Sequence, residues 1–279
     1  MSCAALAGTV AACADDSSGK SDQPVAGGAK GGEIHIYNKN TDMGSSHEAS
    51  ANFYAGGWTD AVEAHCETTT EGSCIISRCQ PFTQEDFARP TPVPVPANAG
   101  TIEIRRSNSD KVLVLDPIRG GLTESGSIWS GGEDIFIKAS GDPAGVPAFE
   151  TTLKAPSMIT VSVPGQTGGK DVRIPRSKDL DVTWTREGAA FGTVKLVLGG
   201  SARGDMSNVA CTYPVESGAG KVPASVLGSL AAGNGGLRFD LTEERTVEID
   251  GGWKVRVSVR AGAAGLDPQG LAGGNVIFE

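Results

Sequence analysis

The sequence predicts an all-β protein, with two β-sandwich domains behind a short flexible tether. Three observations lead to this fold class. Short segments that alternate polar and apolar residues recur about every ten residues along the chain. Glycine and proline number 39 and 15 among 279 residues, which suits a chain with many tight turns. The length is about twice that of a typical domain of roughly 100–150 residues, so we expect two domains.

The N-terminal segment has the features of an export signal. Residues 1–12 carry no charge and end in Val10-Ala11-Ala12, and Cys13 follows directly. An apolar run that ends in small residues is typical of a signal peptide. The cysteine after it resembles a bacterial lipobox, which implies cleavage before Cys13 and acylation of its thiol. The alternative is an apolar terminus that is not processed.

The first two segments of the chain follow from this resemblance. Residues 1–12 are expected to be the remnant of a signal peptide, and because its usual positive charge is missing, we expect either that translation starts further upstream or that the segment has been trimmed. Residues 13–32 are rich in Asp, Ser, Gly, Lys and Ala and bury too little apolar surface to fold. They are expected to form a flexible, lipid-anchored linker.

Four cysteines remain in the part expected to fold, namely Cys66, Cys74, Cys79 and Cys211. An even number in an exported protein indicates two disulfides, for which the sequence allows three connectivities. Gly72-Ser73 is a hairpin signal that places Cys66 opposite Cys79. This register favours the pair Cys66–Cys79 and leaves Cys74 for Cys211, so that the second bridge would join the two domains.

Residues 33–154 are expected to form an N-terminal β-sandwich domain. Residues 33–37 and 101–105 alternate cleanly between polar and apolar side chains. The other strand candidates are residues 49–54, 61–66, 66–70, 74–79, 111–115, 134–138 and 149–153. The proline-rich segment 90–96 is expected to be an extended loop or sheet edge, because proline cannot donate to a strand ladder.

Residues 155–279 are expected to form a second β-sandwich domain. Its strand candidates are residues 158–163, 180–185, 193–198, 208–213, 237–241, 246–249, 253–259 and 275–278. One short helix is expected over residues 223–230, because Pro223 suits a first helical position and Gly233 follows the end.

Residues 156–163, 179–185 and 194–198 resemble the opening strands of fibronectin type III and immunoglobulin-like sandwiches. This resemblance implies an Ig-like fold for the second domain, with Trp184 as an anchor of its core. The layout as a whole is similar to uncharacterised surface lipoproteins of myxobacteria. That similarity, with Ala14 after the cysteine, implies a lipid-anchored protein at the outer membrane or cell surface of a Gram-negative bacterium.

The sequence contains no familiar catalytic signature, so we expect no catalytic residue, no cofactor and no metal site. Two metal alternatives are weaker. Zinc could use the cysteines with His65, but their spacing lacks the close pairs of structural zinc sites. Calcium could use the loop acids Asp116, Asp134 and Asp142, but no calcium-loop pattern surrounds them. His35 and His47 are expected at the surface or at the edge of the core.

The expected function is a non-enzymatic structural or binding role at the cell surface. The net charge of −9 disfavours nucleic acid as a partner. Trp58 and Trp129 lie beside glycine-rich turns and are the candidate ligand-binding residues, with a surface glycan or protein as partner. One alternative is a hydrolase that cleaves extracellular or envelope polysaccharide with a carboxylate pair. The other is an accessory subunit of an envelope complex.

Overall fold

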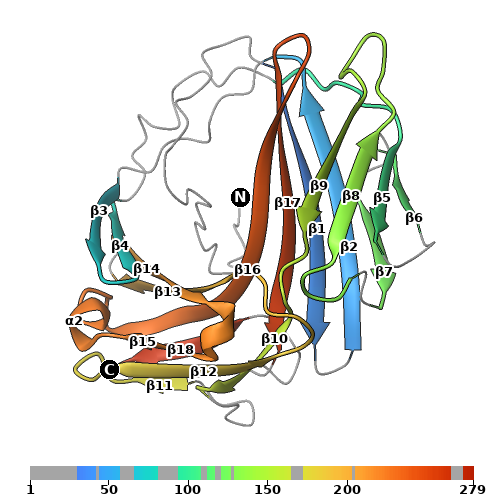
Figure 1. Cartoon of the computed structure of the whole chain (residues 1–279). Helices are drawn as coiled ribbons and strands as arrows, with labels where there is room; N and C mark the ends of the chain where they lie inside the picture. Colours follow the sequence, from blue (N-terminus) through green and yellow to red (C-terminus); the bar gives the residue numbers. More distant parts are fainter. Residues whose placement is uncertain are drawn as a thin grey trace, which may run out of the picture.

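The computed structural model of the chain describes residues 30–41, 44–56, 66–80, 94–107, 112–116, 121–126, 129–164, 172–202, 205–264 and 273–279. Nearly all of the regular structure in these residues is β-strand, so the predicted all-β sandwich class is confirmed (Figure 1). The helical elements among them are the single turns η1 (Val215–Ser217) and α2 (Ala224–Leu227). The helix expected over residues 223–230 is therefore present but shorter.

Two sheets contain the described strands. The strands of the first half are β1 (Lys30–Thr41), β2 (Gly44–Tyr54), β3 (Cys66–Glu71), β4 (Cys74–Cys79), β5 (Ile102–Arg106), β6 (Val112–Leu115), β7 (Leu122–Ser125), β8 (Asp134–Ala139) and β9 (Phe149–Lys154). The strands of the second half are β10 (Ile159–Val163), β11 (Val172–Ile174), β12 (Leu180–Arg186), β13 (Thr193–Ala202), β14 (Asp205–Pro214), β15 (Ala219–Val222), β16 (Gly233–Ile249), β17 (Trp253–Ala264) and β18 (Gly273–Phe278). The smaller sheet has the order β6-β5-β8-β9, and the other strands belong to the larger one.

The small sheet packs against the part of the large sheet that contains β17, β1 and β2 (Figure 1). Alternation along the strands provides the apolar faces, since successive side chains point to opposite sides. Ile34 and Ile36 of β1 are fully buried, and so is Val257 of β17. Ile104 and Ile137 of the small sheet join the same core. Burial of such a side chain stabilises the fold by about 1.5–3 kcal/mol.

Strand pairing crosses the boundary expected between residues 154 and 155. β1, the first described strand, lies parallel to β17 and antiparallel to β2, so it sits inside the large sheet. β4 likewise pairs with β14 of the second half, and β3 continues the sheet beyond it. Strands of the first half therefore join the large sheet at two places, β1 beside β17 and β4 beside β14.

β16 links the part of the large sheet that contains β17 and β1 to the part that contains β13, β14 and β18. Its first part pairs with β13 and β18, and its last part pairs with β17. Residues 237–241 and 246–249, expected as separate strands, are thus two parts of one strand that runs the height of the molecule (Figure 1). Gly251 and Gly252 close the hairpin to β17 with φ of 79° and 80°, a conformation that favours glycine.

Trp184 of β12 is buried, as the resemblance to Ig-like sandwiches implied. Its side chain is 4% exposed, and its indole N–H donates to the carbonyl of Val215 over 3.0 Å. Its ring lies 6.1 Å from that of Tyr213, centroid to centroid. The Tyr213 hydroxyl donates to the carbonyl of Lys221 over 2.8 Å, so both polar tips are satisfied.

The structure contains both disulfides in the favoured connectivity. β3 and β4 form the expected hairpin, in which Cys66 lies opposite Cys79 and is bonded to it. Cys74 lies opposite Cys211 on the neighbouring strand β14, and these two form the second bridge. The second bridge therefore fastens the hairpin to a strand of the same sheet. Cys74 and Cys211 are fully buried.

Candidate functional site

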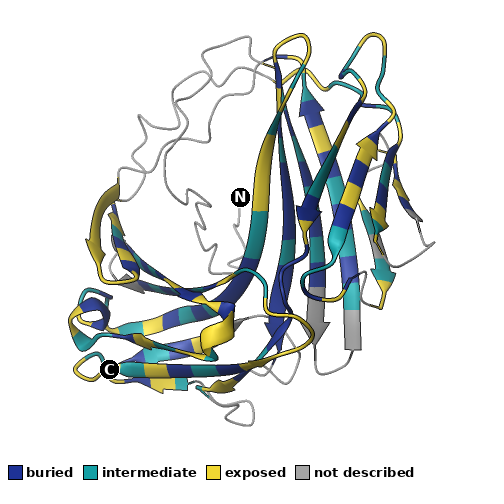
Figure 2. Cartoon of the chain, viewed as in Figure 1, coloured by how far each residue is buried: buried dark blue, intermediate teal, exposed yellow. Residues whose placement is uncertain are grey.

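One face of the large sheet is polar over three adjacent strands, β17, β1 and β2, and we call it the polar face. It is the face opposite the apolar core, and Figure 2 shows exposed and intermediate residues alternating with buried ones along β1 and β2. The register aligns its side chains in rows from β17 across β1 to β2. The rows are Arg256–Glu33–Asn52, Ser258–His35–Ser50 and Arg260–Tyr37–Glu48.

The middle of the polar face is a hydrogen-bonded array of Glu33, His35 and Ser258. The Nε2–H of His35 donates to the carboxylate of Glu33 over 3.0 Å. In the neutral imidazole this leaves Nδ1 as an acceptor for the Ser258 hydroxyl, 2.6 Å away. The hydrogen bond from His35 holds the pKa of Glu33 below its ordinary value despite burial, and Arg256 lowers the pKa further.

This array has the connectivity of an acid, a base and a nucleophile, but its serine is enclosed. A serine nucleophile needs a base within hydrogen-bond reach and a third group that orients the base, and both are present. It also needs room for an electrophilic carbon to approach its oxygen. Ser258 is only 1% exposed. The array therefore fixes the register of β1 against β17 and holds the His35 ring in place.

A second array lies at the point of β16 where its pairing passes from β13 to β17. Asp240 is 4% exposed, and its carboxylate is 2.5 Å from Nε of Arg238 and 3.6 Å from the Arg260 guanidinium. The guanidinium of Arg260 also lies over the ring of Tyr37, 5.8 Å from its centroid. Burial raises the pKa of Tyr37, and the charge of Asp240 raises it further, so its hydroxyl stays protonated at neutral pH.

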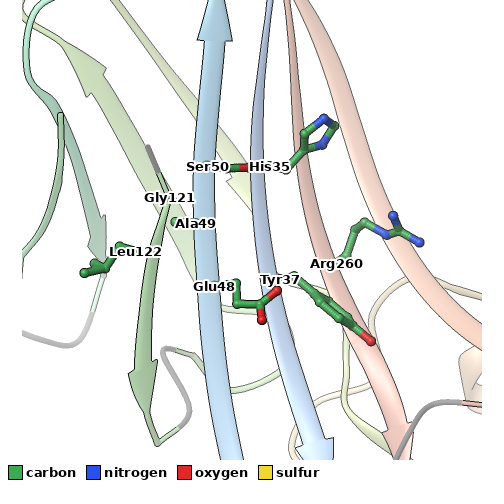
Figure 3. Close-up of a pocket in the computed structure, with 8 residues that line it drawn as sticks. All are labelled: His35, Tyr37, Glu48, Ala49, Ser50, Gly121, Leu122 and Arg260. Atoms are coloured by element: carbon green, nitrogen blue, oxygen red, sulfur yellow. The ribbon is translucent and has the colours of Figure 1, made fainter. Parts of the chain in front are cut away.

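A half-open pocket of about 350 Å³ lies between these arrays and β2. His35, Tyr37 and Arg260 project from β1 and β17 to the same side, and the Glu48 carboxylate turns toward Tyr37 (Figure 3). Ser50 lies beside His35, and Ala49, Gly121 and Leu122 complete the lining. The pocket volume is at the lower end of the roughly 300–1,000 Å³ range of small-molecule sites.

No known family model and no curated protein matches this chain. Its function has therefore to be inferred from its own residues. Across the described ranges, no helix is both long and apolar enough to span a membrane. Nor do the described residues include a group of three or more His, Cys, Asp or Glu side chains that could hold a metal ion.

The two tryptophans proposed as ligand platforms have different outcomes. Trp58 lies outside the described residues, as does Cys13. Trp129 is 1% exposed, and its indole N–H donates to the carbonyl of Pro156 over 3.3 Å. Its ring is thus part of the core and cannot stack on a ligand from solution. The glycine-rich turn after it packs against Ser157 and Ala189 of the second half of the chain, a contact that the local sequence did not reveal.

The metal alternatives find no support in the positions of their residues. Asp134 is bonded to Lys154 over 3.0 Å, and Asp142 accepts from Asn98 over 2.9 Å. The cysteines that zinc would need are paired in disulfides, and His65 lies outside the described residues.

His47, expected at the surface or at the edge of the core, is buried on β2 near its pairing with β7, and its Nδ1–H donates to the carbonyl of Gly126 over 2.8 Å.

Reasoning from the sequence missed the pocket because its residues lie far apart in the chain. The signal that could have indicated it is the alternation in two segments, 33–37 and 254–260, each with polar and charged residues at every second position. Such alternation shows that one face of each strand is polar. It does not show that these two strands are neighbours.

Proposed function

We propose that this chain is an exported protein, held at the cell envelope by a lipid on Cys13, that acts by binding and not by catalysis. The observation that carries the binding role is the pocket on the polar face. Fixed side chains from β1, β2 and β17 line it, and their own hydrogen bonds and ion pairs hold several of them in position. Pre-positioned polar groups around a cavity are what a binding site requires.

The two disulfides support the exported location. Disulfides persist in oxidising compartments and are rare where thiols are kept reduced. Cys74 and Cys211 are 137 residues apart and fully buried, so their bond forms only as the large sheet assembles. The partner we propose is a surface glycan or protein, and the net charge of −9 argues against nucleic acid.

The hydrolase alternative has less support on this face. A glycosidase pair needs one carboxylic acid that stays protonated near neutral pH, so the pKa of that acid must be raised. Glu33 lies on the polar face, and its pKa is lowered by His35 and Arg256. That is the opposite of what a general acid needs, although it suits a carboxylate with a structural role.

The accessory-subunit alternative requires an apolar contact surface. Val114 and Phe136 are exposed on the outer face of the small sheet, at 54% and 45%. Glu103 and Arg105 form an ion pair on β5, the strand between them. These charges interrupt the apolar surface, so we give this alternative second place to ligand binding in the pocket.

The location is tested by the intact mass of the chain. The full reading frame is expressed in a bacterial host and purified from membranes. We expect a mass that begins at Cys13 with acyl chains added and four hydrogens missing for two disulfides. The Cys13→Ala variant should lack the acyl mass and leave the membrane fraction. An unprocessed wild-type chain with free thiols would refute both the anchor and the exported location.

The binding role is tested by retention of envelope components on the oxidised full-length chain. Wild type is compared with Glu48→Gln in the pocket and with Glu150→Gln, the same change at an exposed position on β9. We expect a retained component that is lost with Glu48→Gln and kept with Glu150→Gln. Equal retention by all three chains would show that the pocket is not the binding site.

A further inference from the structure

We propose that the pocket binds a neutral sugar ring at the end or along the edge of a glycan. This inference rests on the proposed binding role and adds the chemical class of the ligand. A pyranose ring has two kinds of surface. Its faces carry C–H groups and are weakly apolar, and its edge carries hydroxyl groups that both donate and accept hydrogen bonds. A site for it needs flat carbon surfaces beside mixed polar groups.

His35 and Tyr37 supply the flat surfaces. Both ring nitrogens of His35 are engaged, one with Ser258 and the other with Glu33. What this ring offers the pocket is therefore its carbon face and not a polar atom. The guanidinium of Arg260 lies against the Tyr37 ring and fixes its orientation. Rings whose orientation is fixed before binding lose little entropy when a ligand arrives.

Glu48, Ser50 and Arg260 supply the polar edge. They line the same pocket as the two rings, and Figure 3 shows the Glu48 carboxylate and the Ser50 hydroxyl next to Tyr37 and His35. A carboxylate accepts up to four hydrogen bonds, a guanidinium donates five, and a hydroxyl does both. The three groups together can match hydroxyls that donate and hydroxyls that accept.

The charges of the pocket favour a neutral ligand. Glu48 and Arg260 carry opposite charges, and the buried carboxylate of Asp240 already lies 3.6 Å from the guanidinium of Arg260. An anionic sugar would have to compete with Asp240 and would meet the charge of Glu48. A cationic ligand would meet Arg260. A hydroxyl-rich neutral ring escapes both repulsions and can still hydrogen-bond with each charged group.

The test uses a printed array that places neutral oligosaccharides beside uronic-acid and sulfated ones, probed with the oxidised full-length chain. The best neutral oligosaccharide is then titrated calorimetrically into wild type, Glu48→Gln and Tyr37→Leu, of which the last removes the flat ring and keeps an apolar side chain of similar size. We expect binding of neutral glycans and a loss of affinity of about tenfold or more with Glu48→Gln, because a charge-assisted hydrogen bond is lost. The Glu150→Gln control should bind like wild type, and thermal unfolding should show that all four chains are folded.

Three results would overturn the proposal. Binding of acidic glycans alone would show that the ligand class is wrong. Neutral binding that Glu48→Gln and Tyr37→Leu leave unchanged would place the glycan elsewhere on the molecule. An array with no binding at all would refute glycan recognition, while the envelope retention experiment would still decide separately whether the chain binds another partner through this pocket.

Discussion

Glu33 shows how a single polar residue can hold two distant strands together. It lies on β1, accepts from His35 on the same strand and pairs with Arg256 on β17. Its side chain is 18% exposed, so these contacts are screened less by water than surface ion pairs are. These contacts favour the ionised form of Glu33 in the folded state, and they therefore lower its pKa.

Glu33→Gln should therefore destabilise the fold in a pH-dependent way. Because the pKa of Glu33 in the folded chain lies below its ordinary value of 4.5, ionisation stabilises the fold above about that pH, and the contribution is lost as the pH falls through the lowered pKa. We expect the free energy of unfolding at pH 7 to fall by about 1.5–3 kcal/mol. Urea unfolding at several pH values should show the difference from wild type shrinking in acid. A constant difference down to about pH 3 would contradict this linkage.

Burial in the folded protein decides whether a tryptophan belongs to the core or could contact a ligand. The neighbouring sequence predicts this for only one of the two described above. Trp129 and Trp184 both end in the core, with their indole N–H groups bonded to backbone carbonyls. Trp184 lies in an alternating strand, so its burial could be predicted from its neighbours. Trp129 precedes a glycine-rich turn, a position equally suited to an exposed ring. Only the packing of that turn against the second half of the chain shows that the Trp129 ring is buried and not exposed.

At the scale of elements, β16 depends on glycines where other backbone comes close. A Cβ on Gly235 would lie 2.3 Å from the carbonyl oxygen of Gly199 and 2.4 Å from the ring of Phe278. A Cβ on the next residue, Gly236, would meet nothing within 4 Å. The first glycine is therefore required by the approach of β13 and β18, and the second is not.

These two glycines give a matched pair of substitutions. Gly235→Ala should lower the free energy of unfolding by about 1–3 kcal/mol, since the clash is with backbone and a buried ring. Gly236→Ala should change it by less than about 0.5–1 kcal/mol in either direction, because alanine fits there and restricts the unfolded chain. Thermal or urea unfolding of both variants decides the matter. Equal effects would mean that β18 does not pack against β16 as described.

The two disulfides should differ in their contributions to stability. The bond between Cys74 and Cys211 closes a loop of 137 residues, and the bond between Cys66 and Cys79 closes one of 13. In the chain-entropy account these loops correspond to about 5 and about 3 kcal/mol. We expect the double alanine variant of Cys74 and Cys211 to lose more stability in urea than that of Cys66 and Cys79. The reverse order would indicate that the bond within the β3–β4 hairpin contributes more stability than the bond between Cys74 and Cys211.

At the scale of the whole molecule, the two halves of the chain complete each other's sheets. β1 covers one edge of β17, and the β3–β4 hairpin extends the sheet beyond β14. Without the first half, β17 would expose the backbone groups that pair with β1. It would also expose the buried valines Val255, Val257 and Val259. An exposed strand edge and an exposed apolar patch both promote aggregation of an isolated sheet.

A fragment of residues 155–279 should therefore not fold alone. We expect it to aggregate or to unfold without a cooperative transition, while the full chain under the same oxidising conditions unfolds cooperatively. Circular dichroism during urea titration and size-exclusion chromatography compare the two. A soluble fragment with a sharp transition would show instead that the second half is an independent domain, as the sequence alone led us to expect.

The sequence by itself determined the local structure of several segments. The alternation of residues 33–37, the turn at Gly72-Ser73 with its consequence for Cys66 and Cys79, and the buried strand around Trp184 could all be predicted. Each of these features depends on backbone geometry and on neighbours within a few residues. The local sequence therefore contains the information needed to predict it.

Long-range pairing is what only the tertiary structure decided. β1 lies beside a strand more than 200 residues later, and this places His35 over Ser258 and Tyr37 over Arg260. Many apolar faces in the chain could have covered β17, since burial of apolar surface is non-directional. The choice among them depends on the packing of the complete chain. The polar face and its pocket follow from that choice, so no segment read alone could have revealed them.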